Sequence, residues 1–217
     1  MSLAIPILLS YLLGSINGSL VLGRLRGGVD IRKQGSGNAG GTNALRTQGP
    51  WFALGVVIID VAKGWVAAGP LTTLAGTAVT PWLPATCALF AVLGHVYPVF
   101  HGFRGGKGAA TLVGTILALS APVLLALLGV WLAIVMLFGF VGLASILAAA
   151  SLPLLFWWLG AEPLLPLLIF AAAAALLVLY THRGNVARMR AGTEPRARRL
   201  WLVGRLAASR KGLGRPR

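Results

Sequence analysis

Acidic residues are scarce in this chain: Asp and Glu together number 4 among 217 residues, against 19 Lys and Arg. Charged residues of both signs make up only 11% of the chain, whereas a soluble domain carries roughly 25%. The single cysteine, Cys87, excludes a disulfide framework and a thiolate metal site within one chain. With a mean hydropathy of +0.84, the composition indicates an integral membrane protein. The start lacks the basic segment of a signal peptide, so we expect the first apolar run to be retained.

The distribution of basic residues predicts the topology. Lys and Arg accumulate in the cytoplasmic loops of membrane proteins, and here they gather in 24–50, in His101–Gly108 and after residue 181. The stretch 109–181 holds one charged residue, Glu162, and its Pro and Gly punctuation favours four short crossings. Together with runs at about 4–22, 51–71 and 82–100, this predicts an all-α polytopic membrane protein. It has about seven transmembrane helices, with the N-terminus outside and the C-terminus inside.

We expect two parts, a transmembrane domain over residues 1–194 and a basic cytoplasmic tail over 195–217. The stretch Arg198–Leu206 mixes basic, Trp and aliphatic residues, which is typical of a short helix at an anionic membrane surface. Nucleic-acid binding is not expected, because the basic residues are divided among loops that flank the spans.

The first polar loop reads GSGNAGGTNALR (35–46). Its glycines allow backbone N–H groups to approach an anion, and Ser36, Asn38, Thr42 and Asn43 add donors. Arg46 offers a bidentate fork for a phosphate or a carboxylate. The loop contains G-x-G-x-x-G, but a charged loop precedes it and a membrane span follows. A dinucleotide-binding unit needs a buried strand before this pattern, so that interpretation is rejected.

The second loop, within Gly94–Thr111, contains Gly105, Gly106, Lys107 and Gly108. It does not match G-x-x-x-x-G-K-[ST], so nucleotide hydrolysis of the P-loop type is not supported. Flexible backbone donors and one ammonium group before a helix N-terminus still favour phosphate binding.

The third stretch, HRGNVARMRAGTE (182–194), follows the last span. His182 and Asn185 lie on one face if the helix continues. For Glu194, a structural pairing with a nearby Arg is favoured over a catalytic function.

Three further residues are polar groups inside apolar runs. Asp60 and Lys63 are three positions apart and can form an ion pair, although Lys63 could instead face an anionic substrate. Ser145 stands in a small-residue stretch, where helix packing competes with a contact to substrate.

The three motifs together resemble the bacterial acyl-phosphate:glycerol-3-phosphate acyltransferases, integral membrane enzymes of phospholipid synthesis. The resemblance covers about Gly14 to Glu194. It implies seven membrane helices in the bacterial cytoplasmic (inner) membrane and a site facing the cytoplasm. The implied reaction moves a fatty acyl group from acyl phosphate to the 1-hydroxyl of sn-glycerol 3-phosphate, giving lysophosphatidate and phosphate as the first step of phospholipid synthesis.

The resemblance also implies residue functions. Catalytic functions fall to Ser36, Arg46, His182 and Asn185, binding of glycerol phosphate falls to Gly105, Gly106, Lys107 and Gly108, and a structural function falls to Glu194. From the residue types and their positions alone, we also expect substrate binding by Asn38, Thr42, Asn43, Lys63 and Ser145, and a structural function for Asp60. The chain departs from the family pattern in having Asn17 where many relatives have proline, and Gly142 where a hydroxyl residue is common.

No metal and no cofactor are expected, because no His, Cys or carboxylate cluster has ligand spacing. The pattern H-x-x-x-x-D is absent, so a His–Asp dyad is not available by motif. Two proton acceptors remain open, His182 and a phosphate oxygen of a substrate. We expect a monomer supplied by an enzyme that forms acyl phosphate. A transporter of organic phosphates is the competing class, but no second half repeats the glycine loops.

Overall fold

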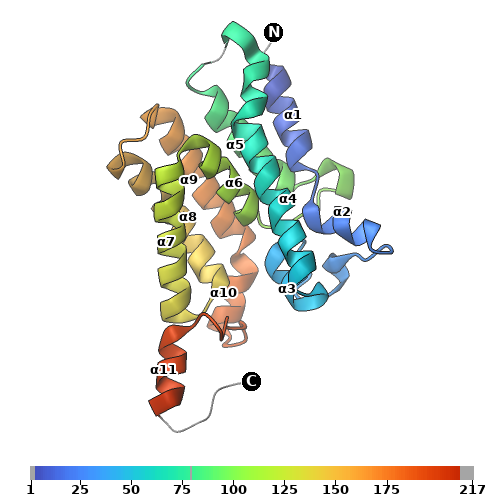
Figure 1. Cartoon of the computed structure of the whole chain (residues 1–217), viewed down its shortest axis with the longest axis vertical. Helices are drawn as coiled ribbons and strands as arrows, with labels where there is room; N and C mark the ends of the chain where they lie inside the picture. The colour runs from blue at the N-terminus through green and yellow to red at the C-terminus, as the bar shows by residue number, and fades with distance from the viewer. Residues whose placement is uncertain (1–2, 79, 211–217) are drawn as a thin grey trace.

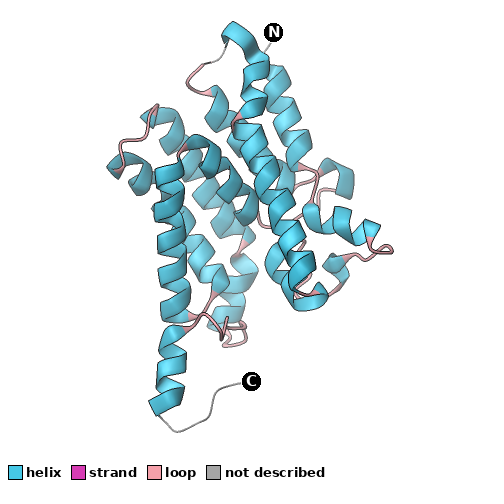
Figure 2. Cartoon of the chain, in the orientation of Figure 1, coloured by secondary structure: helices cyan, strands magenta, loops and turns pink. Residues whose placement is uncertain are grey.

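The computed structural model describes residues 3–78 and 80–210, which form a bundle of helices (Figures 1 and 2). The α-helices are α1 (Ala4–Gly14), α2 (Gly18–Leu25), α3 (Gly41–Gln48), α4 (Pro50–Ala68), α5 (Leu83–Val96), α6 (Ala109–Leu119), α7 (Ala121–Phe138), α8 (Val141–Trp158), α9 (Leu164–Thr181), α10 (Arg183–Arg190) and α11 (Leu202–Arg210). Three 3-10 helices join them: η1 (Ile31–Lys33), η2 (Pro70–Ala78) and η3 (Val99–His101).

Five helical segments of the described chain are long and apolar enough to cross a membrane, or six if the bent pair α1–α2 is one span. The five are Pro50–Thr77, Leu83–His101, Ala121–Phe138, Val141–Trp158 and Leu164–Thr181. The short helix α6 has 11 residues, or about 17 Å at 1.5 Å per residue, against a hydrocarbon core of about 30 Å. The all-helical prediction is confirmed, whereas the count of seven spans is not confirmed by length and composition.

The first span differs from the continuous helix expected over 4–22. It breaks after Gly14, and α1 and α2 are bent by 51° relative to each other. Asn17 has an extended backbone, and its side-chain oxygen accepts hydrogen bonds from Ser19 N (3.2 Å) and Leu20 N (3.4 Å). An N-cap of this kind starts a new helix, so the chain changes direction there.

Helices α4 and α6 pack backbone to backbone. A Cβ on Gly114 would lie 1.9 Å from the carbonyl oxygen of Val61, and one on Gly64 would lie 2.3 Å from that of Thr111. Small residues permit such an approach between membrane helices. This contact holds the start of α6, and therefore the loop before it, against α4.

The main apolar core lies among α5 to α9, with Phe156, Phe170, Ile116 and Leu152 fully or almost fully buried. Helix α6 lies between a group formed by α1, α4 and α5 and a group formed by α7, α8 and α9 (Figure 1). Helices α3 and α10 lie toward the same end of the bundle (Figure 1). The three polar stretches of the sequence are attached to these elements and meet between the two groups.

The C-terminal segment docks on the α7–α8 turn. Trp201 Nε1 donates to the Leu137 carbonyl (3.1 Å), and the Arg196 guanidinium lies 3.9 Å from the centroid of the Trp201 ring. Helix α11 continues beyond the end of α7 in roughly the same direction (Figure 1). The predicted tail therefore contains a helix, but it begins at Leu202, four residues later than the expected stretch Arg198–Leu206. The last residues of the tail, 211–217, lie outside the described residues.

Candidate active site

The first loop is organised around the side chain of Asn43. Its Oδ1 accepts from Ser36 N at 2.9 Å, and its Nδ2 lies 3.0 Å from the carbonyl oxygens of Ile31, Gln34 and Asn38. Asn43 is 1% exposed. The amide is fully engaged in shaping the loop, which differs from the expectation that Asn43 contacts substrate.

The other polar groups of this loop face outward. Ser36, Thr42 and Arg46 are exposed and Asn38 is half-buried. Because Asn43 fixes the backbone beneath them, the two hydroxyls, the amide and the guanidinium of this loop are not needed to shape it and stay available to a ligand.

The second loop is fixed to the end of α5 by its backbone. Gly105 N donates to Val96 O and Gly106 N donates to His95 O, both at 3.1 Å. Gly108 caps α6 with φ +85°, a conformation that favours glycine. These contacts place Lys107, half-buried, between the loop and the helix that follows it.

Arg32 holds the second loop from the other side, and sequence reasoning did not single it out. Its Nη1 donates to the carbonyl oxygens of His101 (3.0 Å) and Arg104 (2.9 Å). Asp30 pairs with the same guanidinium at 2.9 Å, and this contact lowers the pKa of Asp30 below its ordinary value.

A chain of polar contacts joins the second loop to the third stretch. The Lys107 ammonium donates to Asn185 Oδ1. Asn185 Nδ2 donates to Glu194 Oε1 (2.6 Å), and Arg188 Nε donates to Glu194 Oε2 (2.6 Å). Thr181 adds a second link, because its hydroxyl donates to the Lys107 carbonyl at 3.1 Å. The predicted residues Lys107, Asn185 and Glu194 are thus brought together, and Arg188 and Thr181 join them.

Burial lowers the pKa of Lys107 to about 8, and the nearby positive charges of Arg188 and Arg46 act in the same direction, while Glu194 opposes them. A bound anion offsets the repulsion between Lys107 and the neighbouring cations, and so stabilises the protonated form of Lys107. The site is therefore electrostatically prepared for a phosphate group.

His182 is buried and neutral. Its Nδ1 lies 2.9 Å from the Val178 carbonyl, which can only accept, so Nδ1 carries the hydrogen and Nε2 keeps a lone pair. Burial, followed by the positive charge of Lys107, lowers the pKa of His182 to about 4. At neutral pH its free nitrogen is a hydrogen-bond acceptor or a base.

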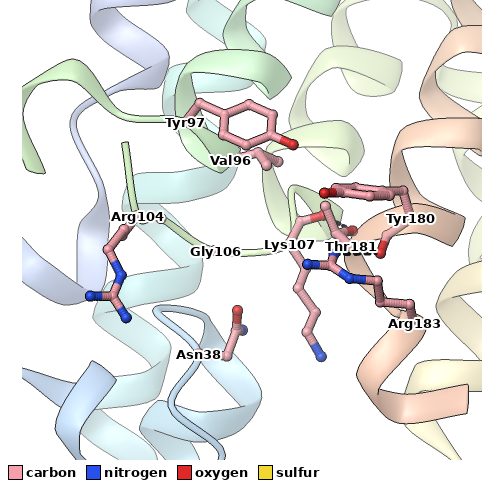
Figure 3. Close-up of a pocket in the computed structure, with 10 residues that line it drawn as sticks. Asn38, Val96, Tyr97, Arg104, Gly106, Lys107, Tyr180, Thr181 and Arg183 are labelled. Atoms are coloured by element: carbon pink, nitrogen blue, oxygen red, sulfur yellow. Dashed lines mark hydrogen bonds between the residues drawn. The ribbon is translucent and has the colours of Figure 1, made fainter. Parts of the chain in front are cut away.

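Two adjoining hollows meet at Lys107. The first, of about 210 Å³, is shown in Figure 3 and is lined by Asn38, Val96, Tyr97, Arg104, Gly105, Gly106, Lys107, Tyr180, Thr181 and Arg183. The second, of about 280 Å³, is lined by Ser36, Gly37, Asn38, Lys107, Thr181, Arg183, Gly184 and Arg188. Four residues belong to both, and among them Asn38, Lys107 and Arg183 come from three separate parts of the chain (Figure 3).

The lining contains cations that sequence reasoning did not single out, Arg104, Arg183 and Arg188. The Arg183 guanidinium lies 4.2 Å from the centroid of the Tyr180 ring, which holds it over the first hollow's edge. Arg183 and Arg188 both belong to the third motif, so their position in that motif was the available signal. Among the described residues, no group of three or more His, Cys, Asp or Glu could hold a metal ion.

Lys63 does not reach these hollows. Its Nζ lies 2.8 Å from Asp60 Oδ1, donates to the Ile16 carbonyl at 2.8 Å, and lies 2.9 Å from His95 Nδ1. All three donors are used inside the bundle, so the structure favours the ion pair over the substrate contact expected for Lys63.

Ser145 is also engaged elsewhere. Its hydroxyl donates to the Val141 carbonyl (3.0 Å) and lies 3.3 Å from Trp131 Nε1, and it lines neither hollow. Gly142, one turn earlier on α8, packs against Asn185: a Cβ there would lie 2.8 Å from Asn185 Nδ2.

Known proteins resemble this chain over most of its length. Residues 4–192 match the family model described as glycerol-3-phosphate acyltransferase. A glycerol-3-phosphate acyltransferase of Synechococcus sp. (strain JA-3-3Ab) is 47% identical over 191 residues, covering 88% of this chain and 91% of the relative. That of Chlorobaculum parvum is 37% identical, covering 88% of this chain and 94% of the relative.

Solved structures agree with this match. The crystal structure of PlsY, an integral membrane glycerol 3-phosphate acyltransferase, in its glycerol 3-phosphate form superposes with a TM-score of 0.82 and 38% identity, covering 90% of this chain and 96% of that one. Its lysophosphatidic acid form gives a TM-score of 0.80 at the same identity, covering 90% and 95%. With the family model spanning the helices and all three polar motifs up to residue 192, the chain belongs to the glycerol-3-phosphate acyltransferase family.

Proposed function

We propose that this protein transfers a fatty acyl group from acyl phosphate to the 1-hydroxyl of sn-glycerol 3-phosphate, giving lysophosphatidate and phosphate. The observation that carries the proposal is the pair of cationic hollows that meet at Lys107. Both substrates carry a phosphate, and two adjoining anion sites can hold them side by side. The crystallised relative PlsY is described in forms with glycerol 3-phosphate and with lysophosphatidic acid, which supports the acceptor and the product.

The reaction mainly requires that the two substrates are positioned and that the negative charge developing in the transition state is stabilised. The glycerol hydroxyl attacks the carbonyl carbon of the acyl phosphate, a carbon–oxygen ester bond forms, and the bond from the carbonyl carbon to the phosphate oxygen breaks. Phosphate leaves with the bonding electrons. Holding the two reactants together and stabilising the developing oxyanion lower the barrier.

In this scheme the cations bind phosphate. Lys107 holds the phosphate of glycerol 3-phosphate. Gly105 and Gly106, whose N–H groups bind the Val96 and His95 carbonyls, and Gly108, which caps α6, set the backbone on either side of Lys107. Ser36 and Asn38, which line the second hollow, hold the phosphate of the donor together with Thr42 and Arg46 of the same loop, which line neither hollow.

His182 and Asn185 orient the acceptor hydroxyl, and Glu194 holds Asn185. The proton from the hydroxyl goes either to the free Nε2 of His182 or to a phosphate oxygen of a substrate. His182 is neutral at pH 7 and can accept this proton, because its pKa lies at about 4.

The same proposal places the site on the cytoplasmic face of the bacterial inner membrane. Helix α6 is then also a crossing, although a short one, and it brings the number of spans to seven. The N-terminus lies outside. The basic residues of 24–50, His101–Gly108 and the C-terminal tail support this orientation. We further propose that the protein acts as a monomer and receives its donor from an enzyme that forms acyl phosphate.

Purified protein in detergent, given acyl phosphate and labelled glycerol 3-phosphate without ATP, CoA or added metal, is expected to form labelled lysophosphatidate. Substituting acyl-CoA for acyl phosphate is expected to give no product. Lys107→Ala is expected to raise the KM for glycerol 3-phosphate by roughly tenfold or more. Lys33→Ala serves as the matched control, because Lys33 is an exposed lysine on η1 that lines neither hollow. Activity that depends on CoA, or an unchanged KM in Lys107→Ala, would overturn the donor or the phosphate site respectively.

A further inference from the structure

A buried cluster of three ionisable side chains lies beneath the second loop: Asp60 and Lys63 on α4 and His95 on α5. They are 0%, 4% and 2% exposed, and none lines either hollow. Burying ionisable groups within a membrane bundle is costly in free energy, and such groups usually have a function. An apolar trio of similar volume would often be no less stable, so the cluster calls for a function.

The contacts of Lys63 determine which nitrogen of His95 carries hydrogen. An ammonium group donates three hydrogen bonds and accepts none. Lys63 Nζ has three acceptors, Asp60 Oδ1 and Ile16 O at 2.8 Å and His95 Nδ1 at 2.9 Å. His95 Nδ1 therefore accepts, and the hydrogen of the neutral ring is on Nε2.

Asp60 fixes the position of the ammonium group. Its Oδ1 also accepts from Gly18 N at 3.1 Å, at the start of α2, and lies 3.4 Å from His95 Nδ1. One carboxylate oxygen thus ties α2, α4 and α5 together around Lys63.

The Nε2 edge of His95 lies where the first and second loops meet. A Cβ on Gly106 would lie 2.1 Å from His95 Nε2 and 2.9 Å from the Ala39 carbonyl oxygen. Gly106 N donates to the His95 carbonyl, and Asn17 Nδ2 donates to the Ala39 carbonyl at 3.3 Å. Gly106 is therefore enclosed between the imidazole edge and the backbone of the first loop, directly before Lys107.

We propose that Asp60, Lys63 and His95 are positioning residues for the phosphate-binding loop. The ion pair holds His95 in one tautomer and orientation, and the Nε2 edge of His95 sets the backbone of Gly106 against Ala39. With the backbone at Gly105 and Gly106 fixed in this way, the ammonium group of Lys107 is aligned for the phosphate of glycerol 3-phosphate. The inference rests on the proposed function and adds to it the residues that determine affinity for the acceptor.

Two substitutions of His95 separate positioning from general stability. Asn places a polar atom near the site of Nδ1 but leaves the space beside Gly106 empty, whereas Gln places an amide near the site of Nε2. His95→Asn is expected to raise the KM for glycerol 3-phosphate by roughly tenfold with kcat changed by about twofold or less. His95→Gln is expected to restore KM to within about threefold of wild type.

A double substitution tests the ion pair without leaving a single buried charge. Asp60→Asn with Lys63→Met removes both charges together and retains the Oδ1 that accepts from Gly18 N. It is expected to raise the same KM by about fivefold or more, because the orientation of His95 is no longer fixed.

The control is Thr115→Val. Thr115 is fully buried on α6 beside Gly64 of α4, and its hydroxyl donates to the Leu112 carbonyl within its own helix. It is expected to change thermal stability in detergent without changing KM.

The measurements are KM and kcat for both substrates, calorimetric binding of glycerol 3-phosphate without a donor, and the unfolding midpoint. A His95→Asn protein with unchanged KM, or a Thr115→Val protein with an equal rise in KM, overturns the positioning inference. A Gln variant no better than the Asn variant also overturns it. A wild-type protein that neither binds glycerol 3-phosphate nor transfers the acyl group overturns the proposed function instead, so the two failures are distinguishable.

Discussion

The ammonium group of Lys107 donates a hydrogen bond to Oδ1 of Asn185, and so joins the loop before α6 to the helix after α9. Asn185 in turn donates to Glu194, which pairs with Arg188. A substitution anywhere in this row of four residues therefore acts on Lys107 as well.

The affinity for glycerol 3-phosphate should fall as pH rises above 8. The pKa of Lys107 is lowered to about 8 from its ordinary 10.5, so the free enzyme loses this positive charge in that range. We expect the KM for glycerol 3-phosphate to rise between pH 8 and pH 10, with a limiting slope of about tenfold per pH unit. The measurement is KM across pH 6.5–10 at constant ionic strength.

Lys107→Arg provides the comparison for this profile. Arginine stays protonated over the whole range. The KM of the Lys107→Arg variant for glycerol 3-phosphate should therefore stay constant above pH 8, even if it differs in value from the wild-type KM. A rise in KM that persists unchanged in Lys107→Arg would assign the titration to another group.

His182 should act as a neutral side chain throughout the physiological range. Because its pKa is lowered to about 4, His182 should produce no acid limb near pH 6.5 in wild-type kcat/KM, which reports the free enzyme. His182→Ala is expected to lower kcat by about 100-fold or more, since a positioned acid–base or orienting group contributes on that scale. Near-wild-type turnover in His182→Ala would remove this residue from the mechanism.

Glu194 should affect both stability and kcat through its hydrogen bond to Asn185. Glu194→Ala leaves the buried Asn185 amide and Arg188 without their acceptor, which costs about 1–3 kcal/mol in the free energy of unfolding. We expect a lower unfolding midpoint together with a fall in kcat. Glu194→Gln keeps an acceptor for Asn185 and should retain more activity. Glu162→Gln, at the exposed turn before α9, is the control expected to change neither quantity.

Gly142 should tolerate no side chain. A Cβ there would lie 2.8 Å from Asn185 Nδ2 and 2.9 Å from its Cβ, so Gly142→Ala must displace Asn185. We expect kcat to fall by about tenfold or more. Gly129→Ala on α7, where a Cβ meets nothing within 4 Å, should leave kcat unchanged. Equal activity of the two variants would show that the position of Asn185 is not critical.

Sequence patterns located the three polar segments, but they did not show which side chains face the hollows and which ones shape the loops. The charge asymmetry predicted that these segments share one side of the bundle, and the hollows at Lys107 draw on all of them. Some side-chain directions depend on neighbours far along the chain. Lys63 points to His95, 32 positions away, and Thr181 donates to the Lys107 carbonyl, 74 positions away. Others depend on the shape of an irregular loop: Asn43 bonds to backbone groups 5 to 12 positions earlier. Residue spacing alone predicts neither kind of contact.

The observed helix boundaries differ from the predicted ones where an average of hydropathy over several residues hides a local break in the helix. Asn17 interrupts an apolar run with a single side-chain cap, which hardly changes the mean over a 20-residue window. Helix α6 is short because Ser120 adopts an extended backbone at its end, directly before α7. Capping is a local, polar effect, and an apolar average does not register it.

The crossing of α4 and α6 has a mechanical consequence. Where Gly64 and Gly114 bring two backbones into contact, no layer of adjustable side chains lies between them. Close-packed contacts have low compressibility, so we expect the two helices to move together. Thr111, in the first turn of α6, touches α4 at Gly64, and Lys63 is the residue before that glycine. The loop that carries Lys107 is thus connected to the buried charges on α4 through a rigid backbone contact.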